Sequence, residues 1–308
     1  MNITSVGKVT DRITLLGRSE SCLYLLDGTT ENWLVGGSMA YVAPDIARQM
    51  TALGIDEGRI TRMFILHTHF DHCGAVPFLK KRMPQAIVTA SVRAGELLTR
   101  PDIAQSIAHL NNEGIARYGL APEAQRQGFH YDRLAVEETV SDGRSMSCGD
   151  LPVQVLEVPG HSSCSMALYL PGLKALFASD AVGLYLDGKV QPTPNSNFDL
   201  YQQSLERLAR YDVQALLLEH FGAFLGESAG QFIAQAIDAA RRTRRTLEEA
   251  YRRTRDVKVF TEEITARLFS RPVEAILPEA VRAAVAGQIA RYIAKTIEAG
   301  EAVKNSNP

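Results

Sequence analysis

Short apolar runs that end in glycine, proline or a polar residue recur through the first 220 residues. Their length and their β-branched and aromatic content are typical of strands. Helical patterns around 44–53 and 75–83 interrupt the early runs, so strands and helices alternate, and the order predicts an α/β fold. The runs are RITLLG (12–17), CLYLLD (22–27), NWLVGG (32–37), RMFILH (62–67), AIVTA (86–90), LPVQVLEVPG (151–160), SMALYLPG (165–172), KALFASD (174–180) and VQALLLEH (213–220).

Two regions have a helical pattern without strand-like runs. Residues 91–130 predict a helical insertion between strands, and residues 228–308 predict a C-terminal helical cap on a domain that spans 1–227. Both regions could lie over one edge of the sheets and enclose a pocket. In the cap, apolar side chains recur at near-helical spacing, which predicts core packing or a homodimer through the C-terminal helices more than a ligand groove. They are Val281, Val285, Ile289 and Ile293.

Composition and charge narrow the class of protein. The 308 residues are 45% hydrophobic and 22% charged, which is typical of a globular protein. A formal net charge of −2 gives no overall attraction to nucleic acid or to anionic membranes, so we expect neither as a partner. The N-terminal residues lack a basic region and a continuous apolar region, and no spanning segment follows, so we expect a cytoplasmic protein. The four cysteines form no CxxC pair, which predicts reduced thiols.

Three of the seven histidines lie within the segment FILHTHFDHCGAV (64–76). His67 and His69 alternate with other residues, so an extended or tightly turned backbone can point both imidazoles the same way. Asp71 and His72 follow one short turn later. Neutral imidazole binds zinc, iron and similar divalent metals, and a carboxylate stabilises the charge of a dication. The segment therefore predicts two neighbouring sets of metal ligands.

Further candidate ligands follow other apolar runs. His161 lies after VQVLEVPG, Asp180 after ALFAS and His220 after ALLLE. Each alone would be an ordinary loop residue. Together with the first segment they place five of the seven histidines at the ends of expected strands, which favours one metal centre at a shared edge.

This pattern resembles the metallo-β-lactamase fold superfamily over roughly residues 10–225. The signature H-x-H-x-D-H matches His67, His69, Asp71 and His72, and the later ligands match His161, Asp180 and His220. The resemblance implies a four-layer αββα sandwich with the catalytic domain over 1–227. It also implies that His67, His69 and His161 hold one metal, that Asp71, His72 and His220 hold the other, and that Asp180 bridges them. Many hydrolases of the family have G-H-G at the last histidine, whereas this chain has Glu219 before His220.

The chemistry that the resemblance implies is hydrolysis of a small-molecule ester or thioester by a hydroxide between two divalent metals. Zinc is the expected metal, and iron or manganese remain alternatives. We place Asp71 as the catalytic residue and expect Ser162, Ser163 and Cys164 to be turn residues beside the site, without a triad. The layout of the insertion and the cap is similar to that of glyoxalase II-type thioesterases. It is more similar to that of the aminobenzoylacetyl-CoA thioesterases of the bacterial quinolone-signal pathway.

Other interpretations remain open from the sequence. A di-iron redox protein and a regulatory binding protein that keeps the metal site are alternatives, and a nuclease is a weaker one. Cys73 is expected to be a packed thiol, and His109 and His130 to lie on the surface or in helix packing. One arginine-rich run predicts a solvated helix face paired with Glu248 and Glu249 more than a coenzyme A phosphate site. Its members are Arg241, Arg242, Arg244, Arg245, Arg252, Arg253 and Arg255.

Overall fold

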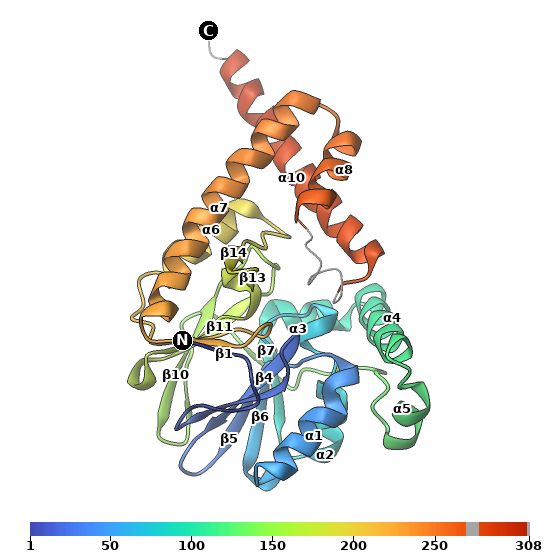
Figure 1. The fold of residues 1–308 in the computed structure, drawn as a ribbon, viewed down its shortest axis with the longest axis vertical. Coiled ribbons are helices and arrows are strands. Elements are labelled where there is room, and N and C mark those ends of the chain that lie inside the picture. Colours follow the sequence, from blue (N-terminus) through green and yellow to red (C-terminus); the bar gives the residue numbers. More distant parts are fainter. Residues whose placement is uncertain (269–276, 307–308) are drawn as a thin grey trace.

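The computed structural model describes residues 1–268 and 277–306, and its centre is a pair of seven-stranded sheets (Figure 1). In the first sheet the early strands pair antiparallel and the strands from β5 onward pair parallel. Its order is β2 (Gly7–Thr10), β3 (Ile13–Arg18), β4 (Ser21–Asp27), β5 (Asn32–Val35), β6 (Ile60–Phe64), β7 (Ile87–Ser91) and β8 (Glu138–Val140).

The second sheet is antiparallel except for the β12–β15 pair. Its order is β1 (Asn2–Ile3), β16 (Ala223–Leu225), β15 (Ala215–Leu217), β12 (Ala175–Phe177), β11 (Met166–Leu170), β10 (Leu151–Glu157) and β9 (Ser145–Cys148). A separate hairpin pairs β13 (Leu184–Leu186) with β14 (Lys189–Gln191). Because β10, β12 and β15 run in the same direction, their carboxyl ends meet at one edge of this sheet.

The two faces of the second sheet bury different sets of side chains. Leu168 and Phe177 point into the core between the sheets, whereas their neighbours Ala167 and Leu176 point to the outer core. This alternation is the period of two of a strand that is buried on both faces. Tyr24 of the first sheet makes an edge contact with Phe177 at a ring-centroid distance of 5.7 Å, which joins the two sheets. The result is a continuous inter-sheet core.

Helices cover both outer faces, and so the αββα sandwich is confirmed. On the first sheet, α1 (Ala43–Ala52) and α3 (Val92–Thr99) contact strands, and α2 (Val76–Arg82) packs against α1. On the second sheet, α7 (Glu227–Thr254) contacts β15 and β16, and α6 (Phe198–Leu208) packs against α7. Short 3-10 helices join these layers: η1 (Ala40–Val42), η2 (Glu57–Arg59), η3 (Phe70–His72), η4 (Pro171–Leu173) and η5 (Ser179–Val182).

The remaining helices lie where the sequence predicted them. The insertion contains α4 (Pro101–Arg117) and α5 (Ala121–Gln127) after α3, and α4 contacts η1 and η3. At the other end of the chain, α8 (Val257–Leu268) and α10 (Glu279–Ser306) pack against each other and against α7 (Figure 1). Residues 269–276 and 307–308 of the predicted cap lie outside the described residues. The division into domains 1–227 and 228–308 stays a proposal.

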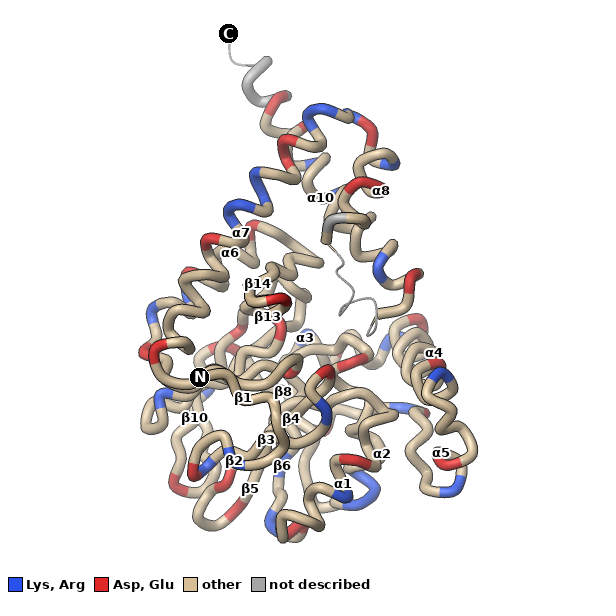
Figure 2. The backbone as a smooth tube through the Cα atoms, in the orientation of Figure 1, with Lys and Arg blue, Asp and Glu red and all other residues tan. Residues whose placement is uncertain are grey.

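Basic and acidic residues are interspersed along α7, α8 and α10, as Figure 2 shows. Most of the arginine-rich run is ion-paired within the chain, to Glu206, Glu248, Glu263 or Glu301 among others. The predicted pairing with Glu248 is confirmed for Arg244 and Arg252, whereas none of the ion pairs among the described residues involves Glu249, and the preference over a coenzyme A phosphate site stays a prediction. None of the helices within residues 1–268 and 277–306 combines the length and the apolar content that crossing a bilayer requires.

Candidate metal centre

The seven candidate ligands lie on loops that leave four strands at one edge of the sandwich. His67, His69, Asp71 and His72 follow β6, and the last two belong to η3. His161 follows β10, Asp180 lies in η5 after β12, and His220 follows β15. The turn before His161 contains Gly160, whose φ of +131° is rarely adopted by L side chains. All the candidates converge, and six of the seven are buried.

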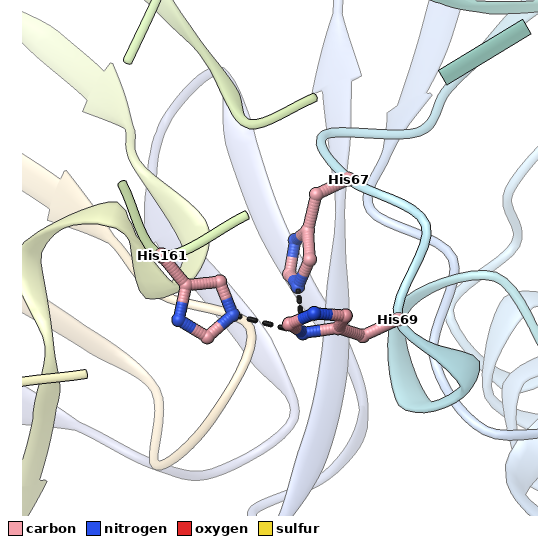
Figure 3. Close-up of side chains that lie close together, drawn as sticks. All are labelled: His67, His69 and His161. Atoms are coloured by element: carbon pink, nitrogen blue, oxygen red, sulfur yellow. Dashed lines mark hydrogen bonds between the residues drawn. The ribbon is translucent and has the colours of Figure 1, made fainter. Parts of the chain in front are cut away.

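The first group consists of three imidazoles whose nitrogens face a common point (Figure 3). His69 Nδ1 lies 3.1 Å from His67 Nε2 and 2.9 Å from His161 Nε2. All three nitrogens lie within 4.8 Å of one another. Three convergent imidazole nitrogens are the donor set of a tetrahedral metal site with one position left for water or substrate.

The second group consists of Asp71, His72 and His220, whose ligand atoms also lie within 4.8 Å of one another. His220 Nε2 is 3.0 Å from His72 Nε2, and Asp71 Oδ2 is 3.4 Å from His220 Nε2 and 3.5 Å from His72 Nε2. One carboxylate and two imidazoles form a mixed donor set that zinc, iron and manganese accept.

Asp180 lies between the two groups. Its Oδ2 is 3.5 Å from His161 Nε2 of the first group, and 3.2 Å and 3.8 Å from His72 Nε2 and His220 Nε2 of the second. Its Oδ1 is buried and has no hydrogen-bond partner among the described residues. A buried carboxylate with an unsatisfied oxygen is costly unless a cation neutralises it, so the surroundings of Asp180 fit a bound cation.

The far nitrogens of three imidazoles contact protein oxygens. His161 Nδ1 lies 2.9 Å from the carbonyl oxygen of Thr193 and His220 Nδ1 lies 2.6 Å from that of Glu20. His67 Nδ1 is 3.3 Å from Ser179 Oγ. Because a carbonyl oxygen only accepts, the proton of a neutral His161 or His220 is on Nδ1, and its Nε2 carries a lone pair. Lone pairs that face one another in a buried site fit divalent cations.

Protonation in this site follows from burial and from close charges. Burial holds the pKa of His67 well below its usual value and lowers the pKa of His69 to about 3, so both are neutral. Burial alone would raise the pKa of Asp71 and Asp180, but the positive charge of His72 outweighs it and both carboxyls are ionised. Burial would lower the pKa of His72, yet Asp180 and Asp71 raise it well above normal, so a bound cation would displace a proton.

Sequence reasoning missed two residues that support the ligands. Glu219 was noted only as a departure from the G-H-G pattern, and Ser179 was not noted. The structure buries both, with Glu219 Oε2 accepting a hydrogen bond from Ser179 Oγ and lying 3.1 Å from His72 Nδ1. The available signal was a charged residue that interrupts the apolar run ALLLEH (215–220).

A cavity of about 760 Å³ opens over the two groups. Its floor is polar, with Thr68, Ser162, Ser163, Asn195 and Ser196 beside His69, Asp71, His161, Asp180 and His220. Its walls are apolar and come from the two helical regions: α4 contributes Ile103, Ile107 and Leu110, and α10 contributes Val281, Val285 and Ile289. Side chains of the insertion and of the C-terminal helices therefore line a cavity over the candidate ligands, which agrees with the predicted position of both regions over this edge of the sheets.

The apolar side chains of α10 contact both the core and the cavity. Val281 and Val285 were expected in a core or a dimer seam; both are partly buried against the hydrophobic core and also line the cavity, and the dimer seam stays a prediction. Ile289 and Ile293 are buried in the outer core, and Ile289 also reaches the cavity. The periodicity identified the apolar face of the helix correctly, but periodicity contains no information about what lies opposite that face.

The turn after His161 and the packing of Cys73 agree with the predictions from the sequence. Ser162 and Cys164 lie in a turn in which Ser162 Oγ is 2.7 Å from Ser165 Oγ, as expected. Cys73 is a packed thiol: its Sγ donates to the carbonyl oxygen of His69 at 3.3 Å, and burial raises its pKa.

The two histidines outside the site lie on or near α4. His109 is exposed on α4, as expected, but it also contributes to the rim of the cavity. His130 packs against α4, with its Nδ1 3.3 Å from Asn112 Oδ1.

The fold and the convergent ligands agree with a family comparison. The model of the metallo-beta-lactamase superfamily matches residues 19–220. The chain belongs to this superfamily of metal-dependent hydrolases. A solved relative, the metallo-beta-lactamase family protein TTHA1429 from Thermus thermophilus, has a TM-score of 0.65 at 19% identity, and the match covers 95% of both chains. At that identity the likeness shows the fold.

Curated relatives of this superfamily member include thioester hydrolases. The chain is 27% identical over 225 residues to the acyl-coenzyme A thioesterase MBLAC2 of Gallus gallus, with coverage of 68% of this chain and 78% of that protein. It is 28% identical over 174 residues to a hydroxyacylglutathione hydrolase of Rhizobium etli, with coverage of 56% and 53%. The match to the Bos taurus MBLAC2 spans 61% of that protein's length.

Proposed function

We propose that this protein is a binuclear metal-dependent hydrolase of thioesters, or of related small esters, that carry an apolar acyl group. In this proposal His67, His69 and His161 hold one metal and Asp71, His72 and His220 hold the other, with Asp180 between them. The observation that carries it is the convergence of two groups of ligand side chains around Asp180, with His69, Asp71, His161, Asp180 and His220 lining the floor of the cavity. Zinc is the expected metal, with iron and manganese as alternatives.

The residues of the chain have distinct tasks in this mechanism. Bound dications would acidify a shared water and polarise the substrate carbonyl oxygen. His161 and His220 keep Nε2 unprotonated by directing Nδ1–H to backbone carbonyl oxygens. Asp71 reaches the cavity floor, where we place its carboxylate as the catalytic group that orients the attacking water. Neither Ser162 nor Cys164 is needed as a nucleophile.

The cavity walls favour a thioester with an apolar acyl group. Ile103, Leu110, Val281 and Val285 are only partly buried, although their apolar faces line a cavity above the metal floor. Apolar surface that remains exposed in a cavity is typical of a ligand site. A thiolate also leaves without obligatory protonation, so the reaction needs no general acid at the floor. The thioesterase relatives are consistent with this substrate class.

Metal analysis followed by a substrate panel tests the proposal. The protein, purified without added metal, is analysed for bound metals and assayed with acyl-coenzyme A, acyl-glutathione, lactone and phosphodiester substrates. We expect close to two metals per chain and thioester turnover that a chelator abolishes and that added Zn²⁺ restores. Turnover that is insensitive to complete metal removal, or two bound metals without cleavage of any thioester or ester, would contradict it.

A further inference from the structure

Glu219 is a buried carboxylate that the proposed mechanism does not use. The residue is 2% exposed although it is next to His220, which lines the cavity. Oε1 accepts a hydrogen bond from the backbone N–H of Gly37 at 3.1 Å. Oε2 accepts from the hydroxyl of Ser179 and lies 3.1 Å from His72 Nδ1. Both oxygens thus have partners, and those partners come from three separate segments.

The backbone after β5 is shaped around this carboxylate. At Gly36, φ is +98° and an added Cβ would lie 2.6 Å from Glu219 Oε1. At Gly37, an added Cβ would lie 2.3 Å from the carbonyl oxygen of His72. Real Cβ atoms do not approach this closely, so a side chain at either position would displace the carboxylate or the ligand loop. The two glycines therefore keep Glu219 and His72 in contact.

Glu219 reaches both groups of candidate ligands. His72 belongs to the second group and faces Oε2 directly. His67 belongs to the first group, and its Nδ1 lies 3.3 Å from Ser179 Oγ, which donates its proton to Glu219. One carboxylate is thus connected to a ligand of each metal, directly on one side and through a hydroxyl on the other.

We infer that Glu219 is a positioning residue shared by both metal positions, and this inference rests on the proposed function. Its carboxylate lies 3.1 Å from Nδ1 of His72, which has no hydrogen-bond partner among the described residues, and its negative charge favours the tautomer with the proton on Nδ1 and Nε2 free to bind metal. Its acceptance of the Ser179 proton orients the hydroxyl so that a lone pair faces Nδ1–H of His67. A carboxylate behind a metal-bound histidine fixes its tautomer and raises its basicity, and losing it typically costs about 10- to 100-fold in metal affinity or activity.

Glutamine at position 219 is a sharp test because it preserves size, removes the charge and replaces one acceptor oxygen by an NH₂ donor. An amide has one oxygen and one NH₂ group. If the oxygen faces Gly37, the NH₂ group points at His72 Nδ1 and favours the tautomer whose Nε2 carries the proton. If the oxygen faces His72, the NH₂ group points at the N–H of Gly37. Either orientation disturbs the arrangement that the parent carboxylate satisfies.

The experiment titrates metal into metal-free protein against a chromophoric chelator and compares the parent with three variants. We expect Glu219→Gln to weaken both bound metals by about 10- to 100-fold. Ser179→Ala removes only the connection to His67 and should weaken one of the two metals. Glu31→Gln is the control, because Glu31 accepts hydrogen bonds from Trp33 and from Thr61, which lies at the end of β6 opposite the ligands. This variant should leave the affinities for both metals unchanged.

Visible spectra of Co²⁺-loaded protein give a second readout that is independent of turnover. A change of the absorption bands in Glu219→Gln, with unchanged circular dichroism, would support a role in ligand orientation. Parent affinities for both metals in folded Glu219→Gln would overturn the inference and leave the proposed function standing. If Glu219→Gln does not fold, Ser179→Ala decides, since parent affinity for both metals in that variant overturns the shared role. A parent protein that binds no metal would instead refute the proposed function.

Discussion

Replacing Gly160 by alanine tests whether the turn before His161 is as constrained as the geometry indicates. Gly160 has φ of +131°, and an added Cβ would lie 2.2 Å from the backbone nitrogen of Tyr201 and 2.3 Å from its Cα. The obstacle is the backbone of α6, which cannot rotate away as a side chain could. The carbonyl of Gly160 also accepts the N–H groups of Ser196 and Asn197, both at 3.0 Å, so the turn is held from two sides.

The expected loss of folding stability in Gly160→Ala has two parts. A side chain in left-handed backbone costs roughly 1–2 kcal/mol. Forcing extra atoms into a packed site costs about 1–3 kcal/mol more. Gly160→Ala should therefore lower the free energy of unfolding by about 2–5 kcal/mol. Gly128→Ala is the matched control, because Gly128 has φ of +77° with nothing within 4 Å of an added Cβ and should show only the first part.

Urea denaturation of both variants measures the difference, provided that the slope against denaturant stays at the parent value. Since His161 Nε2 lies only 2.9 Å from His69 Nδ1, a displaced turn should also weaken metal binding in Gly160→Ala but not in Gly128→Ala. Equal losses of stability in the two variants would refute the steric reasoning. Parent metal affinity in Gly160→Ala would show that the turn does not determine the position of His161.

Three further predictions follow from the site, the cavity and the core. His69→Ala should lose one of two bound metals, by elemental analysis, and at least about 100-fold of kcat/KM, since a catalytic metal contributes several kcal/mol; unchanged turnover would exclude the assignment. Val285→Trp should narrow the cavity and lower kcat/KM for long-chain thioesters by about tenfold or more, which is about 1.4 kcal/mol, and leave kcat/KM for acetyl thioesters unchanged. The control Val259→Trp, on the exposed side of α8, should leave kcat/KM for both substrates unchanged. Phe177→Ala should lower the free energy of unfolding by about 3–5 kcal/mol in denaturant titration, because it empties the contact between the sheets; a loss below about 1 kcal/mol would contradict that.

The sequence predicted much of the fold and the positions of the ligands, because both depend on local patterns. Short apolar runs bounded by polar or turn residues identify strands such as β10 and β11, and the histidines and aspartates follow such runs. Partners far apart in the sequence could not be predicted. Glu219 meets Gly37 across 182 positions and Ser179 across 40, and neither contact has a local signal. The strand β1 was not predicted for the same reason, since its two residues are defined by pairing with β16.

The spacing of the ligands along the chain has a consequence for how the protein is made. His69 and His161 are 92 positions apart, and His72 and His220 are 148 positions apart. The set of candidate ligands is therefore incomplete on the nascent chain until His220, which follows β15, has been synthesised. Tight metal binding requires that late segment. We therefore expect metal ions to bind the completed chain and not the nascent one.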